Sequence, residues 1–151
     1  DKLHGTQEGD FLMKTKIIIA SHGRFAEGIM DSLKMIAGEQ DHVEPLCAYI
    51  DRSVDYSARI RQLVADHDYE KQALLVITDL LGGSVNNEFM RFTEDYPFYL
   101  VSGLNLSLLL ELALYPDELK SDTIQKIVEH NSDYIVFFSG DNLHLQEEND
   151  F

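Results

Sequence analysis

The residues with the clearest capacity for chemistry are a histidine and an aspartate that follow two predicted strands. His22 lies in Ala20-Ser21-His22-Gly23, directly after a short apolar run, and Asp79 ends a second apolar run. A neutral imidazole is a good nitrogen nucleophile near pH 7 because one ring nitrogen carries a free lone pair. It attacks best when the other nitrogen donates a hydrogen bond to a fixed acceptor. We therefore interpret His22 as a phosphoryl-accepting nucleophile and Asp79 as the acceptor that orients it.

A transferring phosphoryl group also needs hydrogen-bond donors around its oxygens, because this chemistry consists mostly of positioning and charge stabilisation. The segment Gly82-Gly83-Ser84 offers backbone N–H groups, close backbone approach and a hydroxyl at the predicted start of a helix. Asn105 follows a further predicted strand, and we expect it to join Gly82, Gly83 and Ser84 in binding the phosphoryl group. No His/Cys cluster has metal-ligand spacing, so the sequence predicts a phosphohistidine site without a metal or cofactor.

Each of these residues also has an ordinary structural explanation. A histidine after a strand often only packs in a loop, and an aspartate at a strand end often caps a turn. Ser84 and Asn105 are residue types common at helix N-caps, and the glycines also suit turn geometry. The functional interpretation is favoured because separate loops carry complementary chemical groups.

The elements that must position these residues alternate between strands and helices. Short apolar runs rich in β-branched residues predict buried strands at residues 16–20, 43–50, 73–79, 98–102 and 134–138. Helical spacing follows the strands, with Phe25, Ile29, Leu33 and Ile36 facing inward in the first helix and Ile124, Ile127 and Val128 in the last. This order predicts an α/β three-layer sandwich, with an open, mostly parallel sheet and helices on both faces. Because the carboxyl ends of parallel strands share one edge, the candidate residues are expected to converge there.

Composition limits the classes of function. The chain has 151 residues, 44% of them hydrophobic, which is enough for one domain with a single core. Its 12 Lys and Arg residues against 27 Asp and Glu residues give a formal net charge of -15, which repels phosphate backbones and anionic lipids. We therefore expect no nucleic-acid binding. No run approaches the roughly 20 apolar residues needed to span a bilayer, so we also expect no direct membrane insertion. A single cysteine, Cys47, favours the reducing cytoplasm.

The domain is expected to occupy residues 13–138, with Met13 as the native start. Residues 1–12 show no hydrophobic periodicity, and we expect them to be vector-derived or disordered. Residues 139–151 are expected to form an acidic tail of low structure content.

Three segments resemble a known family. They are Ile17-Ile18-Ile19-Ala20-Ser21-His22-Gly23, Thr78-Asp79-Leu80-Leu81-Gly82-Gly83-Ser84 with Asn87, and Gly103-Leu104-Asn105. Their order and spacing resemble the mannose-family IIA component of the bacterial phosphoenolpyruvate:sugar phosphotransferase system (PTS), over roughly residues 14–138. The resemblance implies that His22 accepts a phosphoryl group from the phosphocarrier HPr and passes it to a IIB component during sugar uptake. It further implies work alongside the membrane components IIC and IID, with Asp79 as the partner of His22, and Gly83, Ser84 and Asn87 on the phosphate side.

The resemblance also implies a homodimer in which the terminal strand, here Tyr134 to Phe138, is exchanged between subunits. The sequence departs from the family at two positions, where Val85 and Ser107 stand in place of frequent prolines. Proline pre-sets the start of a helix, so its absence bears on rate and partner specificity more than on reaction type. Two alternatives stay open: a phosphocarrier subunit that feeds a dihydroxyacetone kinase, and a non-catalytic anion-binding regulatory domain in which His22 only hydrogen-bonds a ligand.

Overall fold

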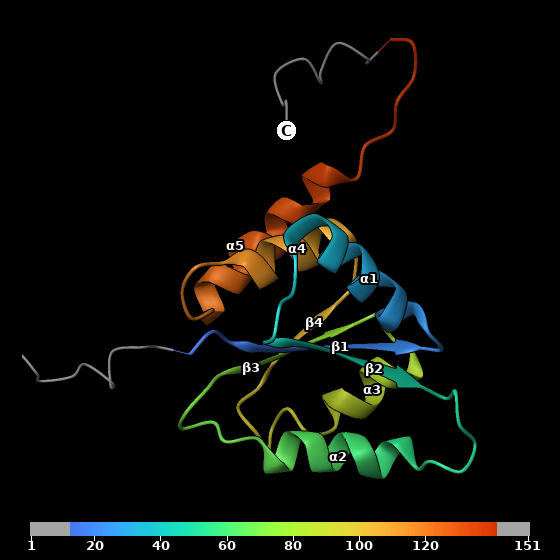
Figure 1. Cartoon of the computed structure of the whole chain (residues 1–151), viewed down its shortest axis with the longest axis vertical. Coiled ribbons are helices and arrows are strands. Elements are labelled where there is room, and N and C mark those ends of the chain that lie inside the picture. Colours follow the sequence, from blue (N-terminus) through green and yellow to red (C-terminus); the bar gives the residue numbers. More distant parts are fainter. Residues whose placement is uncertain (1–12, 142–151) are drawn as a thin grey trace, which may run out of the picture.

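Parallel strands form the central layer of the computed structural model, which describes residues 13–141 (Figure 1). The strands are β1 (Lys16–His22), β2 (Val43–Ala48), β3 (Leu74–Thr78) and β4 (Tyr99–Ser102). They lie in the order β2-β1-β3-β4, and every neighbouring pair is parallel. The open parallel sheet confirms the predicted fold class. The expectations for residues 1–12, and for the acidic tail beyond residue 141, fall outside the described range.

Helices cover both faces of this sheet. They are α1 (Phe25–Ala37), α2 (Tyr56–Asp66), α3 (Ser84–Met90), α4 (Leu106–Leu114) and α5 (Ser121–Asn131). In Figure 1, α1, α4 and α5 lie on one side of the sheet, and α2 and α3 lie on the other. No helix within residues 13–141 is both long enough and apolar enough to cross a membrane.

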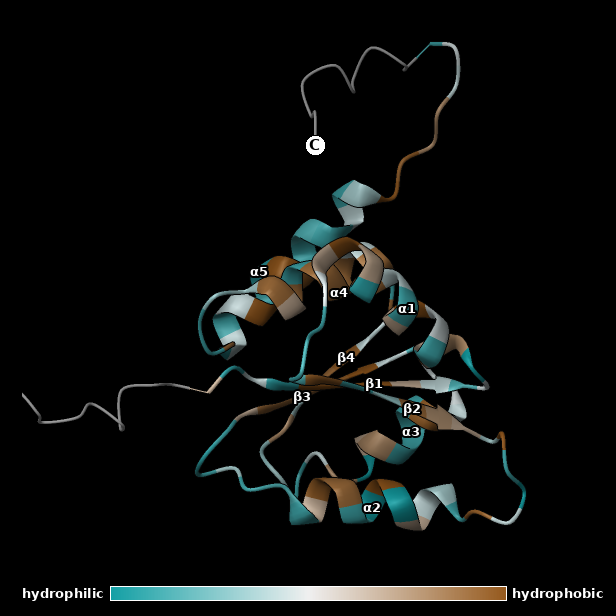
Figure 2. Cartoon of the chain, in the orientation of Figure 1, coloured by the Kyte–Doolittle hydropathy of each residue, from teal (hydrophilic) through white to brown (hydrophobic). Residues whose placement is uncertain are grey.

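Alternate strand residues face the two helical layers, which explains why the strands are apolar throughout. On β1, Ile17 and Ile19 belong to the core cluster under α1 and α4, whereas Ile18 belongs to the cluster under α2 and α3. Figure 2 shows hydrophobic residues along the sheet and on the helix surfaces that meet it. Fully burying one such side chain stabilises a fold by about 1.5–3 kcal/mol. Because each strand buries several of them, the strands and the residues at their ends are held in place.

The predicted inner faces of two helices are partly wrong. On α1, Phe25 and Ile36 are 49% and 61% exposed, because the buried stripe runs instead through Ala26, Ile29, Met30 and Leu33. On α5, Ile124 is buried as predicted, but Val128 is 39% exposed. The error arises because several apolar stripes are possible on helices that carry more apolar residues than one face can bury.

The predicted fifth strand at residues 134–138 is wrong for the single chain. Ser132–Tyr134 forms a 3₁₀ turn (η1) after α5, and the chain then leaves the domain without regular structure (Figure 1). Ile135 and Val136 are 78% and 50% exposed. A strand needs a neighbouring strand to pair its backbone groups, and a β-favouring composition alone does not supply one.

Candidate active site

His22 and Asp79 lie side by side because β1 and β3 are neighbours in the sheet. The pairing of the two strands ends at Ala20 and Thr78, and the Asp79 N–H donates to the Ala20 carbonyl at 3.1 Å. One carboxylate oxygen, Oδ2 of Asp79, accepts from the His22 backbone N–H at 2.8 Å and lies 2.8 Å from His22 Nδ1. An ionised carboxylate only accepts hydrogen bonds, so Nδ1 carries the proton of the neutral ring. The lone pair is therefore on Nε2.

Nε2 of His22 points toward the start of α3. It lies 3.0 Å from Oγ of Ser84, the first residue of that helix. The Ser84 hydroxyl therefore donates to the lone pair of the resting imidazole. The His22 side chain is 44% exposed and that of Asp79 only 13%, so the nucleophile is open to solvent while its orienting group is covered. The second carboxylate oxygen of Asp79 is buried and has no hydrogen-bond partner among residues 13–141.

The glycines bring the loop between β3 and α3 against the histidine ring. Gly82 has a φ of 77°, a conformation that favours glycine. A Cβ at Gly83 would lie 3.2 Å from Cε1 of His22 and 3.2 Å from the Leu80 carbonyl oxygen. The Gly83 N–H donates to that same carbonyl at 3.1 Å, which closes the turn. The close approach of loop and ring therefore requires the absence of a side chain at position 83.

Asn87 and Asn105 are engaged elsewhere. The Asn87 amide donates to the Gly82 carbonyl at 3.1 Å and so holds the glycine turn. The Asn105 side chain accepts from the Leu108 N–H at 2.9 Å, as the cap of α4, and its amide donates to Asn131 at 2.8 Å. Within the described residues, neither side chain hydrogen-bonds to His22. The structure thus brings together His22, Asp79, Gly83 and Ser84, and gives the two asparagines contacts that hold loops and helices.

Buried hydroxyls support the site in ways the sequence reasoning missed. Ser21 is fully buried, and its Oγ accepts from the Ala26 N–H at 2.8 Å, which anchors the start of α1 beside His22. Thr78 is also buried, and its hydroxyl donates to Asn86 Oδ1 at 2.7 Å, which ties α3 to the end of β3. Ser21 stands four residues before the first residue of α1, whose N-cap is Arg24, so it does not match the usual capping signal in the sequence.

A tyrosine also stands beside the histidine. The rings of Tyr49 and His22 have centroids 5.5 Å apart and planes tilted by 46°. No feature of the sequence pointed to this contact, because Tyr49 falls inside the strand predicted at residues 43–50, whereas β2 ends at Ala48.

Charged and metal-binding groups add little around the site. Arg24, two residues after His22, is exposed and pairs with Glu27 at 3.3 Å along the same helical turn. Between residues 13 and 141 there is no group of three or more His, Cys, Asp or Glu side chains that could hold a metal ion. The imidazole of His22, held by Asp79 and Ser84 and partly exposed to solvent, offers the chemistry of an oriented nucleophile.

In sequence and fold the chain is similar to IIA components of the PTS. The sequence model of the EIIA-man family, described as PTS system fructose IIA component, matches residues 16–130. A Klebsiella pneumoniae structure assigned to a phosphoenolpyruvate-dependent sugar PTS permease is 37% identical, covers 84% of this chain and 93% of that chain, and has a TM-score of 0.75. The mannose/sorbose-specific IIA subunit from Enterococcus faecalis is 28% identical, covers 84% of this chain and 96% of that chain, and has a TM-score of 0.69. The PTS component EIIA from Streptococcus agalactiae is 32% identical, covers 82% of this chain and 97% of that chain, and has a TM-score of 0.65. The chain therefore belongs to the EIIA-man family of PTS IIA components.

Proposed function

We propose that this chain accepts a phosphoryl group from phospho-HPr on Nε2 of His22 and passes it to a IIB component during sugar uptake. The observation that carries the proposal is the pair of contacts on the imidazole, Nδ1 to Asp79 at 2.8 Å and Nε2 to Ser84 at 3.0 Å. They fix the ring, its tautomer and the nitrogen that attacks. Because the proposed donor and acceptor are proteins of the cytoplasm, we place the reaction there.

The transfer exchanges one nitrogen–phosphorus bond for another. The Nε2 lone pair of His22 attacks the phosphorus of the donor phosphohistidine, the donor's N–P bond breaks, and its electron pair returns to the donor imidazole. Positive charge develops on the His22 ring as the new bond forms, and the Asp79 carboxylate stabilises it. The proton on Nδ1 stays in its hydrogen bond to Asp79. Transfer to the IIB component follows the same steps in reverse.

Ser84 is the first candidate for holding the phosphoryl oxygens. Its hydroxyl donates to Nε2 at 3.0 Å in the resting state and is close enough to turn to an oxygen of the group that takes that position. Space around Gly82 is open, and the Gly83 backbone lies against the ring, so both are candidates for backbone contact with the phosphoryl group. We assign Asn87 and Asn105 to holding this edge of the sheet, because their amides are engaged with Gly82 and with Asn131.

Reconstituted phosphorylation tests the proposal. The protein is incubated with phosphoenolpyruvate, enzyme I and HPr, and its intact mass is measured before and after acid treatment. We expect an acid-labile phosphoryl adduct on the wild-type chain and none on His22→Ala. The adduct should then disappear when a cognate IIB component is added. An absent adduct, or one that survives His22→Ala, would refute a phosphocarrier role for His22.

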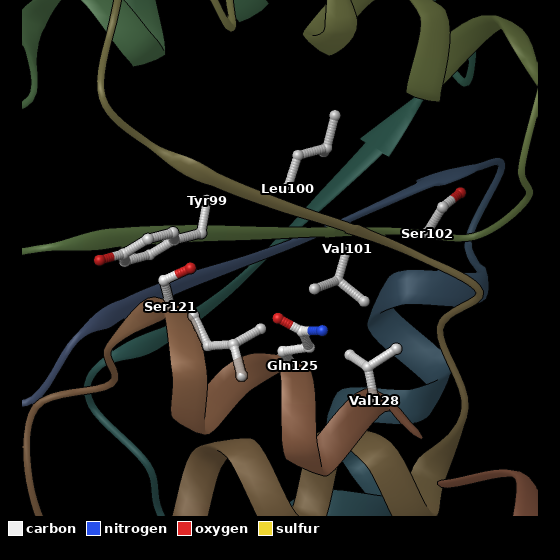
Figure 3. A pocket seen from close by; sticks show the side chains of 8 residues that line it. Tyr99, Leu100, Val101, Ser102, Ser121, Gln125 and Val128 are labelled. Carbon is white, nitrogen blue, oxygen red and sulfur yellow. The ribbon is translucent and has the colours of Figure 1, made fainter. Parts of the chain in front are cut away.

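We further propose a homodimer that exchanges residues 134–138. The outer edge of β4 has no neighbouring strand in the described chain, and a groove of about 340 Å³ lies between β4 and α5. Figure 3 shows Val101 on β4 pointing toward Gln125 and Val128 on α5 across this groove. An unpaired strand edge beside a groove of mixed polar and apolar lining is a pairing site for a further strand. The apolar segment that leaves the domain after η1 supplies such a strand to the partner subunit.

A charge placed in the exchanged segment tests the dimer. Ile135→Asp should give a monomer by sedimentation velocity, because an aspartate cannot be buried without a partner. Met35→Asp is the matched control, since Met35 is an 89% exposed apolar residue of α1, remote in sequence from the segment, and it should leave the dimer intact. A monomeric wild-type chain, or a dimer that tolerates Ile135→Asp, would contradict the exchange.

A further inference from the structure

Tyr49 has a backbone conformation that tyrosine rarely adopts. Its φ is 65°, and it is the one non-glycine residue of the described chain with a positive φ. This conformation is disfavoured for a residue with a Cβ and especially for a bulky one. Such strain persists only where the surrounding structure holds it, and it gathers at functional sites.

The neighbouring structure holds Tyr49 from both sides. Its preceding residue, Ala48, ends β2 opposite His22, and the Ala48 carbonyl accepts from the Gly23 N–H at 2.9 Å. On the other side the Tyr49 ring lies edge-on to buried Tyr56, with centroids 5.6 Å apart. The Tyr56 hydroxyl accepts from the Asp51 N–H at 3.3 Å, which ties down the turn that follows.

The strain does not serve the core. Tyr49 is 50% exposed, so a smaller residue would satisfy the turn with little loss of packing. Its ring instead contacts the imidazole of His22, with centroids 5.5 Å apart. A cation over the face of an aromatic ring, within about 6 Å of its centroid, is attracted through the ring quadrupole. Tyr49 is thus placed where positive charge develops during phosphoryl transfer.

We propose that Tyr49 is a positioning residue for phosphoryl transfer at His22. Its ring holds the imidazole in line with Asp79 and Ser84 and stabilises the charge on that imidazole as Nε2 takes the phosphoryl group. The inference rests on the proposed function, and it adds the turn after β2 to a site otherwise formed by β1, β3 and α3. It changes neither the bonds exchanged nor the position of the proton on Nδ1, and it needs no further reactant.

Three substitutions separate the ring from the backbone. Glycine and asparagine tolerate a positive φ and lack an aromatic ring, whereas Tyr49→Phe keeps the ring. Tyr49→Gly and Tyr49→Asn should therefore unfold at or above the wild-type temperature. Their single-turnover transfer from saturating phospho-HPr should fall about two- to fivefold, the range expected for an exposed contact between a cation and an aromatic ring. Tyr49→Phe should transfer at the wild-type rate, and the donor concentration for half-saturation should not change in any variant.

Nitrogen NMR of the unphosphorylated protein gives a second readout that does not depend on transfer. His22 should show the tautomer with the proton on Nδ1 in the wild type and Tyr49→Phe, and a larger share of the other tautomer in Tyr49→Gly and Tyr49→Asn. Unchanged transfer and tautomers in the ringless variants would overturn the proposal. So would a change confined to half-saturation, which would make Tyr49 a docking residue. A wild-type chain that takes no phosphoryl group would instead refute the proposed function, and the tautomer comparison would still decide whether Tyr49 positions the ring.

Discussion

Gly83→Ala tests the close approach of the glycine turn to the nucleophile. The backbone at Gly83 has a φ of -70° and a ψ of 161°, which alanine adopts without strain. The new methyl group would nevertheless lie 3.2 Å from Cε1 of His22 and 3.2 Å from the Leu80 carbonyl oxygen. That carbonyl is tied to the Gly83 N–H, so we expect the half-exposed His22 ring to yield by a few tenths of an ångström.

The cost of this shift falls on transfer and not on folding. Cε1 lies between the two ring nitrogens, so its displacement disturbs both the 2.8 Å contact to Asp79 and the 3.0 Å contact to Ser84. A misplacement of about 1 Å can cost about 100-fold in rate, so a few tenths of an ångström should cost roughly four- to tenfold. Replacing glycine where alanine fits stabilises a fold by about 0.4–1 kcal/mol, which offsets the crowding. The unfolding temperature should therefore stay within about 2 °C of the wild type.

Gly82→Ala is the matched control, one residue earlier in the same turn. A methyl group there meets nothing within 4 Å, but the φ of 77° is strained for alanine. We expect a loss of about 1–2 kcal/mol in stability, a fall of roughly 3–8 °C in unfolding temperature, and a smaller loss of transfer rate than for Gly83→Ala. Phosphoryl uptake from phospho-HPr, followed by intact mass, and thermal unfolding measure the two effects. If Gly82→Ala slows transfer more than Gly83→Ala, turn geometry and not contact with the ring controls the site, and the reasoning fails.

Further variants probe the hydrogen bonds of the site and one remote histidine. Asp79→Asn should keep the fold but slow transfer by about 10³–10⁴-fold, because an amide donor facing Nδ1 favours the tautomer that protonates Nε2; an unchanged rate would remove Asp79 from the mechanism. Ser84→Ala should slow transfer by about tenfold, since the phosphoryl group loses one hydrogen-bond donor near its oxygens. Wild-type kinetics in this variant would show that the Ser84 hydroxyl contacts only the unphosphorylated imidazole. Burial lowers the pKa of His42, which donates to the Ala113 carbonyl at 2.9 Å as a neutral ring. The stability that neutral His42 contributes is therefore present at pH values above the ordinary pKa of histidine and is lost as the pH falls through the lowered pKa. The unfolding temperature should fall less between pH 7.5 and pH 5 for His42→Gln than for the wild type. An equal fall would exclude His42 as a source of the pH dependence.

The fold was predictable because its strands are buried on both faces. A residue such as Ile18 on β1 faces one helical layer while Ile17 and Ile19 face the other, so the run is apolar at every position and easily recognised. The ends of elements were harder to predict. Tyr49 has strong β propensity, so residue type alone extends the predicted strand past Ala48. The backbone in fact turns to a positive φ there.

The C-terminal segment shows a second limit of sequence reasoning. Residues 134–138 have the composition of a strand, and in the single chain they have no regular structure. Composition reports that a segment favours pairing, but it does not say whether the partner strand belongs to the same chain. The free edge of β4 and the groove beside α5 are features of the folded domain, and they become visible only once the order of the strands is known.

The chemistry of the site was predictable by residue type, but the division of work between the two ring nitrogens was not. His22 and Asp79 stand out as polar residues at the ends of apolar strands, whereas the choice of nitrogen depends on backbone geometry. Oδ2 of Asp79 holds both the backbone N–H and Nδ1 of His22, so the same oxygen fixes the residue and its ring. A ring held at Nδ1 turns its opposite nitrogen, Nε2, toward Ser84, while the His22 side chain stays 44% exposed against 13% for Asp79. An exposed imidazole oriented by a largely buried carboxylate suits transfer between proteins, because the partner protein must bring its own reacting side chain to within bonding distance of His22.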